Sequence, residues 1–306
     1  MINSQAKDKA TGTICAAVSN IIFGFSFLFS TKALAVADVF VVLGSRFFLG
    51  FLCLNLLFVL KPFRDDFKQP CGKFLPKLLL LGLFEPVIYF ICEQYGLIYT
   101  NSATTGALIA VIPVVVMVFS FLFMKEKSTP IQIAAALLSF VCVVILSVVG
   151  SARGDVKWYG IIILAGAVLA ASAFNVLSRS LGQRFSAFKR TYFMFLLGFV
   201  VFVLVGTIKI GFLEYFNAVA QAFCNKDFLI GILYLSTISS VVAFLLYNVA
   251  TSKVSAVISA SFANASTVVS VLAGVFILKE PFTWIQALCC VGIVVGVLGV
   301  SCCRRA

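Results

Sequence analysis

The decisive stretch of this sequence occurs twice. It reads KEKSTPIQ at residues 125–132 and KEPFTWIQ at residues 279–286, so five of the eight positions agree at an offset of 154. Each copy follows one long apolar run and precedes another. A polar hinge between membrane-length runs, repeated at about half the chain length, indicates duplication. The predicted division is residues 1–150 for the first repeat and residues 151–306 for the second.

The composition is typical of a membrane protein. Hydrophobic residues make up 62% of the 306 positions and charged residues 11%, and the mean hydropathy is +1.14. A soluble protein of this length could not bury so much apolar surface, so most of the chain must face lipid. The net charge of +12 would also suit nucleic acid. Basic residues, however, collect in the cytoplasmic loops of membrane proteins, and we expect no nucleic-acid partner.

Each apolar run is long enough to cross a bilayer as a helix, which takes about 20 residues. The runs lack the alternation of barrel strands, so we predict an all-α integral membrane protein. The segment between the seventh and eighth runs is expected to hold an interfacial helix. The ten predicted spans are 12–32, 38–60, 76–97, 102–124, 131–150, 158–178, 191–209, 228–248, 255–278 and 283–302.

The distribution of Lys and Arg predicts the orientation. If the N-terminus is inside, the cytoplasmic segments hold 16 of these residues and the outer segments hold 6. This bias places both termini in the cytoplasm, for a multi-pass protein of the cell's inner or plasma membrane. Each repeat has five spans, an odd number, so the two copies must insert in opposite senses. Inverted repeats of this kind are the architecture of many secondary transporters.

The pattern resembles the EamA-type transporters of the drug/metabolite transporter superfamily, over nearly the whole chain. Thr267 stands where that repeat often carries proline, so the second copy departs there. The resemblance implies a basket of helices around a central cavity, with the fifth and tenth spans more peripheral. The residues that carry it are Ser102-Ala103, Pro113 and Glu126 in the first half, and Ser255-Ala256 and Lys279-Glu280-Pro281 in the second.

Three charged side chains lie deep in the predicted spans, where a charge is costly. Glu85 is eight residues past Lys77, so about 12 Å deep at 1.5 Å per residue, and Glu93 lies about 12 Å further along. Arg46 enters from the other side and falls between the two carboxylates in depth. The prediction is an Arg–Glu network lining the cavity, in which the carboxylates bind a cationic group, exchange a proton, or both. The alternative is that one carboxylate merely neutralises Arg46.

Prolines and uncharged polar residues complete the candidate site. Pro86 and Pro113 are expected to kink the third and fourth spans. Tyr89 lies four residues from both glutamates, so the three share one helical stripe. The other candidates could line the cavity or could join helices by hydrogen bonds. They are Asn20, Asn175, Ser236, Ser240, Tyr247, Asn264 and Ser266.

The predicted function is secondary active transport of small organic solutes. The resemblance implies export of amino acids, related metabolites or lipophilic cations. Proton coupling is expected because Glu85 and Glu93 are the only acidic groups at depth. The alternative within the superfamily is a carrier of nucleotide-sugars or sugar-phosphates, which would need several intramembrane cations for phosphate. Only Arg46 meets that need.

A passive channel and a membrane-embedded enzyme are further alternatives. The sequence has no histidine, which removes histidine acid–base catalysis and most zinc sites. We therefore expect no enzyme activity, no cofactor and no metal. The expected partners are a small-molecule substrate and the lipid bilayer, with the chain as a monomer or homodimer.

Overall fold

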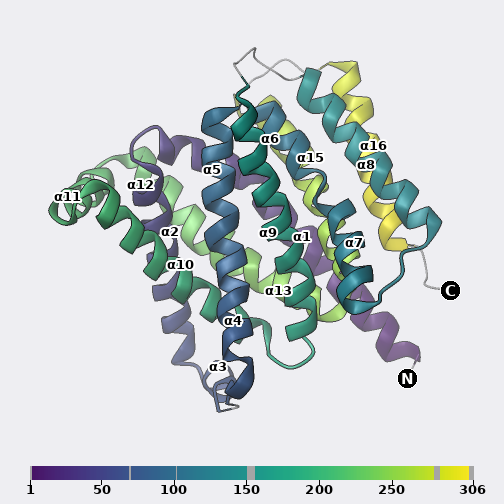
Figure 1. The fold of residues 1–306 in the computed structure, drawn as a ribbon, viewed down its shortest axis with the longest axis horizontal. Helices are drawn as coiled ribbons and strands as arrows, with labels where there is room; N and C mark the ends of the chain where they lie inside the picture. Colours follow the sequence, from purple (N-terminus) through teal and green to yellow (C-terminus); the bar gives the residue numbers. More distant parts are fainter. Residues whose placement is uncertain (1, 69, 101, 150–155, 279–282, 303–306) are drawn as a thin grey trace.

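The computed structural model describes the whole chain except residues 1, 69, 101, 150–155, 279–282 and 303–306 (Figure 1). Within these bounds the regular structure is helical, without strands, and ten segments are long and apolar enough to cross a membrane. The chain is therefore an all-α, multi-pass integral membrane protein, as predicted. The ten segments are Ala6–Leu34, Val39–Phe58, Gly72–Tyr99, Thr104–Met124, Pro130–Val148, Trp158–Leu181, Ala187–Ile210, Lys226–Lys253, Ala256–Ile277 and Trp284–Cys302.

Several spans consist of more than one helix. The elements of the first half are α1 (Ile2–Leu34), α2 (Val39–Phe58), α3 (Lys61–Asp66), η1 (Gly72–Phe74), α4 (Leu75–Gly82), η2 (Leu83–Ile88), α5 (Tyr89–Tyr99), α6 (Ser102–Ile109), α7 (Ile112–Met124) and α8 (Pro130–Val149). Those of the second half are α9 (Trp158–Leu181), α10 (Ala187–Ile210), α11 (Phe212–Phe223), α12 (Lys226–Leu233), η3 (Tyr234–Val242), α13 (Ala243–Lys253), α14 (Ala256–Ser261), α15 (Ala263–Leu278) and α16 (Trp284–Cys302).

Helix boundaries recur at the offset of the repeated hinge. α5 begins at Tyr89 and α13 at Ala243, which is 154 positions later. α8 begins at Pro130 and α16 at Trp284, again 154 positions later. Corresponding spans are five apart along the chain, and successive spans alternate in direction. This is the pattern expected of the predicted inverted repeat.

Both copies of the third span of the repeat are broken near their middle. In the first half the break is the π-helical turn η2, where Glu85 has the non-helical dihedral angles φ −144° and ψ 117° and the Glu85–Pro86 peptide is cis. In the second half the break is the π-helical turn η3. The predicted kinks are confirmed, because η2 contains Pro86 and because Pro113 lies in the first turn of α7, where the fourth span restarts. Such turns are frequent at functional sites.

The repeated hinge caps the helix that follows it in both halves. The hydroxyl of Thr129 accepts a hydrogen bond from the backbone N–H of Gln132 at 3.3 Å, and Oε1 of Gln132 accepts one from the N–H of Thr129 at 3.0 Å. Thr283 and Gln286 make the same pair of bonds at 3.3 and 2.8 Å. These reciprocal capping boxes confirm both threonines as N-caps. The rest of the second hinge, Lys279–Phe282, lies outside the described residues.

A helix lies between the seventh and eighth spans, as predicted. It is α11, at the end of the molecule opposite the termini and at the left edge in Figure 1. The buried Tyr215 donates to the carbonyl of Phe40 at 3.3 Å and ties α11 to α2. Burial, with Asp38 nearby, raises the pKa of Tyr215 to about 12, so the hydroxyl remains a donor. Phe212 and Leu213 are more than two-thirds exposed, which suits the membrane interface.

The fifth and tenth spans, α8 and α16, lie together at the edge of the molecule (Figure 1). They pack closely because α16 presents glycines to α8. A Cβ on Gly296 would lie 2.6 Å from the carbonyl oxygen of Ala135, and one on Gly292 would meet the sulfur of Cys142. The small-residue motif of α16 therefore serves packing within the chain. The peripheral position agrees with the expectation from the resemblance.

Candidate functional site

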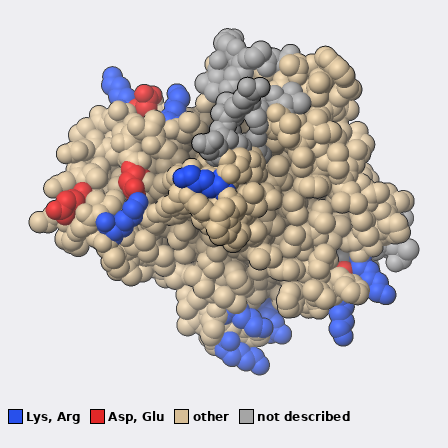
Figure 2. All heavy atoms as spheres, turned by 45° about the horizontal axis from the view of Figure 1, so that its top comes forward, with Lys and Arg blue, Asp and Glu red and all other residues tan. Residues whose placement is uncertain are grey.

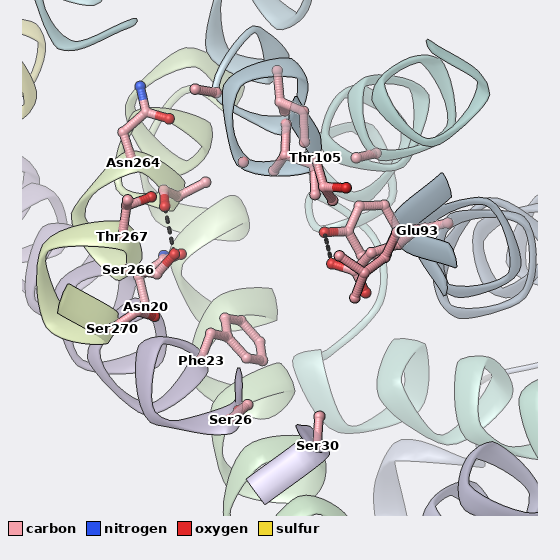
Figure 3. Close-up of a pocket in the computed structure, with 18 of the residues that line it drawn as sticks. Asn20, Phe23, Ser26, Ser30, Glu93, Thr105, Asn264, Ser266, Thr267 and Ser270 are labelled. Atoms are coloured by element: carbon pink, nitrogen blue, oxygen red, sulfur yellow. Dashed lines mark hydrogen bonds between the residues drawn. The ribbon is translucent and has the colours of Figure 1, made fainter. Parts of the chain in front are cut away.

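A cavity of about 740 Å³ with apolar and polar lining lies between the halves, and both contribute to its wall. That volume is within the range of small-molecule sites. Figure 3 shows the glutamate side, with Glu93 and Thr105, facing a wall of hydroxyls and amides that includes Asn20 and Asn264. The lining comes from α1, α2, η2, α5 to α9, α13, α15 and α16.

The cavity opens at the end of the bundle away from the termini. Helices that begin or end there contribute lining residues from their terminal turns. Thr31 and Thr283, at this end, both line the cavity and are exposed. Among the described residues, none of those lining the cavity comes from a helix end on the side of the termini. The conformation is therefore open at one end and closed at the other.

The acidic side of the cavity is formed by η2 and α5. Glu85, Tyr89 and Glu93 all line the cavity, although Glu85 belongs to the break η2 and only Tyr89 and Glu93 lie on the regular helix α5. The side chain of Glu93 is buried, and its Oε1 accepts a hydrogen bond from the Tyr89 hydroxyl at 2.9 Å. Glu85 lies at the helix break, where its extended backbone and Pro86 interrupt the span. Two carboxylates therefore reach one cavity from different positions along the same span.

Arg46 lines the same cavity from α2 and is buried. Its Nε donates to the hydroxyl of Ser240 at 2.7 Å and its Nη2 donates to that of Ser239 at 3.0 Å. The hydroxyl of Ser239 also lies 2.6 Å from that of Ser26, so α1 joins the same hydrogen-bond network. The ring of Phe90 lies 4.8 Å from the guanidinium carbon, a cation–π distance. Arg46 is thus held by the break in the eighth span.

A direct Arg–Glu pair is not formed, which corrects the predicted network. Among the described residues, no carboxylate lies within ion-pairing distance of Arg46. Depth along two helices could not reveal that η3 directs two serines at α2 and occupies the guanidinium's donors. Ser240, a predicted site residue, bonds Arg46 and is not itself part of the cavity wall.

The other predicted residues mostly lie on the wall of the cavity. Tyr247 donates to Oδ1 of Asn175 at 2.6 Å, and both line it. Asn20 lines it while its amide N donates to its own helix. Asn264 and Ser266 line it as well. Ser236 does not: it is fully buried and donates to the carbonyl of Leu233, which is a packing role.

Several cavity residues were not predicted from the sequence. They are uncharged side chains on apolar helices, and a single hydroxyl gives no signal of which face it occupies. Gln94 directly follows Glu93 on α5, but neighbouring residues of a helix point in different directions, so its position gave no signal either. The further polar residues that line the cavity are Ser26, Ser30, Thr31, Gln94, Thr105, Ser147, Thr267, Ser270, Thr283 and Gln286.

The closed end contains a fully buried arginine. Arg190 has 0% exposure and donates to the Ser178 carbonyl at 2.7 Å, to the Thr251 hydroxyl at 3.0 Å and to the Asn248 carbonyl. Ser178 and Asn248 belong to the last turns of α9 and α13, whose C-terminal ends carry partial negative charge. One guanidinium therefore joins the ends of two helices to the start of α10.

Arg190 also corrects the charge count used for orientation. That count placed it in a cytoplasmic loop before a span beginning at residue 191. The helix in fact begins at Ala187, capped by Ser186, whose hydroxyl accepts from the N–H of Lys189 at 3.1 Å. Lys189 is 1% exposed and is also buried. A polar N-cap and two cations resemble a loop in a hydropathy scan, although they form the first turn of the helix.

Further contacts at the closed end join both halves of the chain. Arg179 Nε lies 3.9 Å from Oε1 of Glu126, which follows α7. The same arginine donates to the Ser252 carbonyl at 2.7 Å. Lys253 pairs with Asp8 of α1. The Arg179–Glu126 and Lys253–Asp8 pairs cross between the halves, whereas the bonds of Arg190 join helices of the second half.

Comparisons with known proteins agree with the geometry. The model of the EamA-like transporter family matches residues 10–148 and again residues 158–302. The chain is 30% identical over 287 residues to the uncharacterized transporter YcxC of Bacillus subtilis (strain 168), covering 94% of this chain and 91% of that protein. It is 25% identical over 284 residues to the uncharacterized transporter YetK of the same organism, covering 92% and 83%.

The fold also matches a solved structure. A crystal structure aligns with a TM-score of 0.78 over 95% of this chain and 96% of the other, at 18% sequence identity. Identity at that level supports the fold alone. The family and the sequence relatives support transport as the activity, and not an enzyme reaction.

Proposed function

This chain belongs to the EamA-like transporter family, and we propose that it is a secondary active transporter that exports small organic solutes. The observation that carries the proposal is the cavity, which is open at one end and closed at the other and holds two carboxylates and one arginine. Alternating access between two such states is the expected mode for an inverted repeat. Both broken spans contribute to its wall, the third through Glu85 and α5 and the eighth through Phe244 and Tyr247 of α13.

The chemistry of the wall supports solutes that carry an amine. Glu85 and Glu93 offer acceptors to a cationic group, and the opposite wall offers amides and hydroxyls to a polar remainder. The rings of Phe23 and Phe90 also line the cavity and would contact apolar parts of the solute. Amino acids, related metabolites and lipophilic cations meet this description. One arginine, already bonded to two serines, suits nucleotide-sugars and sugar-phosphates less well.

Proton coupling follows from the balance of charges in the cavity. With both glutamates ionised, the two carboxylates and Arg46 sum to one negative charge, which is costly inside a membrane. Either a proton on Glu85 or the cationic group of the solute restores neutrality. The two then compete for one site, and the protein exchanges a proton moving in for a solute moving out.

The direction depends on which side the termini occupy. The excess of Lys and Arg on the side of the termini supports a cytoplasmic location for that side. The open end of the cavity then faces outward, and an exporter loads its solute after the Arg190 end has opened. We place the protein in the inner or plasma membrane of the cell on the same grounds.

Flux into proteoliposomes tests the function. Purified protein is reconstituted, and uptake of a panel of radiolabelled amino acids, lipophilic cations and nucleotide-sugars is measured with and without a pH gradient. Accumulation of an amine-bearing solute against its gradient, abolished by a protonophore, is the expected result. Equilibration that ignores the pH gradient would indicate a channel, and accumulation of a nucleotide-sugar alone would indicate the other branch of the superfamily. Either result contradicts the proposal.

A further inference from the structure

Three exposed cations converge on one aromatic ring outside the cavity, on the side of the termini. The Nζ atoms of Lys73 and Lys77 each lie 5.8 Å from the ring centroid of Phe74, and the guanidinium carbon of Arg184 lies 4.6 Å from it. The cations come from two segments, η1–α4 and the connection between α9 and α10, that lie more than 100 positions apart in the sequence. We call this group the Phe74 cluster.

The positive charge of the cluster has no acidic partner among the described residues. None of the three cations takes part in an ion pair or hydrogen bond to a carboxylate there, and Asp65 of α3 is already paired with Lys68 at 2.7 Å. Figure 2 shows Lys and Arg side chains gathered at the lower end of the molecule with no acidic side chain among them in that view. Like charges held this close repel, so a bound anion would be stabilised.

An exposed apolar surface continues from the cluster into the membrane. Leu80 lies three residues after Lys77 and therefore on the same face of α4. Leu79 and Leu80 are 38% and 39% exposed, and both belong to the third span. A ligand with a negative head and apolar chains would meet cations first and leucines next. Free phosphate would use only the cations.

We propose that the Phe74 cluster binds the phosphate of an anionic phospholipid, in the leaflet on the side of the termini. The headgroup lies between Lys73, Lys77 and Arg184, and one acyl chain runs along Leu79 and Leu80. Basic pockets beside spans are the usual setting for such recognition. The lipid joins the start of the third span to the connection before α10, and this connection is next to the Arg190 contacts that close the cavity. This proposal concerns binding alone and does not depend on the solute.

Native mass spectrometry of the purified protein in detergent tests the proposal. Dioleoylphosphatidylglycerol, dioleoylphosphatidylcholine and inorganic phosphate are the probes, against wild type and the Lys73→Gln/Lys77→Gln/Arg184→Gln variant. The matched control is Lys61→Gln/Arg64→Gln/Lys68→Gln, which removes the same charge from the neighbouring α3 region. Each cation near an anionic lipid is expected to contribute about fivefold to the affinity. The cluster variant, which lacks three, should therefore bind phosphatidylglycerol about a hundredfold more weakly. The control should change little, and phosphatidylcholine should bind weakly throughout.

A second variant separates lipid from free phosphate. Leu79→Asn/Leu80→Asn should weaken phosphatidylglycerol binding while the cations stay in place, and millimolar phosphate should not displace the lipid. If the cluster and control variants weaken phosphatidylglycerol binding equally, the effect comes from overall charge and not from this site. Displacement by phosphate would make the cluster a free-anion site. Either outcome overturns the proposal. If the triple variant misfolds, Lys73→Gln and Arg184→Gln are measured singly. Unchanged lipid binding by both would also overturn the proposal.

Discussion

Nε of Arg46 lies 2.7 Å from the hydroxyl of Ser240, a residue 194 positions later in the chain. The bond joins the second span to the break in the eighth. The neighbouring acceptor, Ser239, stands 154 positions after Glu85, the acid at the corresponding break in the third span. Arg46 is therefore bonded at one break, and the acid at the other break lines the same cavity. Two equivalent positions in the repeats thus carry a hydroxyl that bonds Arg46 and an acid.

Replacing Arg46 by Gln should lower stability. The change removes two charge-assisted hydrogen bonds, each contributing about 1.5–3 kcal/mol, and leaves two carboxylates without a cation. We expect a lower Tm in detergent, measured by tryptophan fluorescence. Ser240→Ala, which removes one acceptor, should give a smaller decrease. A Tm for Arg46→Gln equal to that of wild type would show that the guanidinium adds nothing to folding.

Glu85→Gln should abolish transport driven by a pH gradient. Glutamine resembles the protonated acid permanently, so the variant can neither release a proton nor offer a full negative charge to an amine. Flux in proteoliposomes should lose its dependence on pH while the protein still inserts and purifies. Glu214→Gln is the matched control, because that acid lies on α11, away from the cavity. Wild-type rate and pH profile for Glu85→Gln would leave Glu93 as the remaining carboxylate to test.

Arg190→Gln should loosen the closed end of the cavity. The variant loses the donors that join Ser178 and Asn248, so the side of the termini opens more often. A cysteine placed at Ala171, on the cavity wall, in a background without native cysteines, reports the opening. Its labelling by an impermeant maleimide from the side of the termini should rise severalfold. Arg64→Gln, which removes an exposed cation, should leave the labelling unchanged.

A second variant at Arg190 keeps the test valid if Arg190→Gln fails to fold. Arg190→Lys keeps the charge but cannot join two helix ends with one planar group. It should show an intermediate rise in labelling. If both variants run as single species in gel filtration and label at the wild-type rate, the Arg190 contacts do not hold the closed end.

Thr129→Val should cost about 1 kcal/mol of stability, the usual value of an N-cap. Thr283→Val should cost a similar amount, because its capping box has the same geometry. Thr207→Val is the control, since that hydroxyl bonds only within its own helix. The solute profile should stay unchanged for Thr129→Val and Thr207→Val, because neither residue lines the cavity. A changed profile at unchanged Tm for Thr129→Val would place the first hinge in the transport site.

Cysteines at positions 127 and 281 test the inverted insertion. In a cysteine-free background, an impermeant reagent added to intact cells should label position 281 and spare position 127. Labelling of both from one side would overturn the inverted repeat. Labelling of position 127 alone would keep the repeat and reverse the assignment of the termini.

The spans were predictable because each depends on the summed hydropathy of about 20 residues, and no single contact changes that sum much. The shared face of Tyr89 and Glu93 was predictable for a related reason, because a four-residue spacing fixes a helical face. The partners of Arg46 were not, because they depend on how η3 directs two serines 194 and 193 positions away. Arg190 was missed because burial by neighbouring helices leaves no trace in local hydropathy.

The close packing of α8 against α16 bears on how a chain of this kind arises. These two helices are counterparts, beginning at Pro130 and Trp284, and they meet through glycines at the edge of the molecule. α16 supplies the glycines and α8 has none, so the two counterparts no longer carry the same surface. Halves joined in one polypeptide can diverge in this way and take different roles in one contact, which two identical subunits could not.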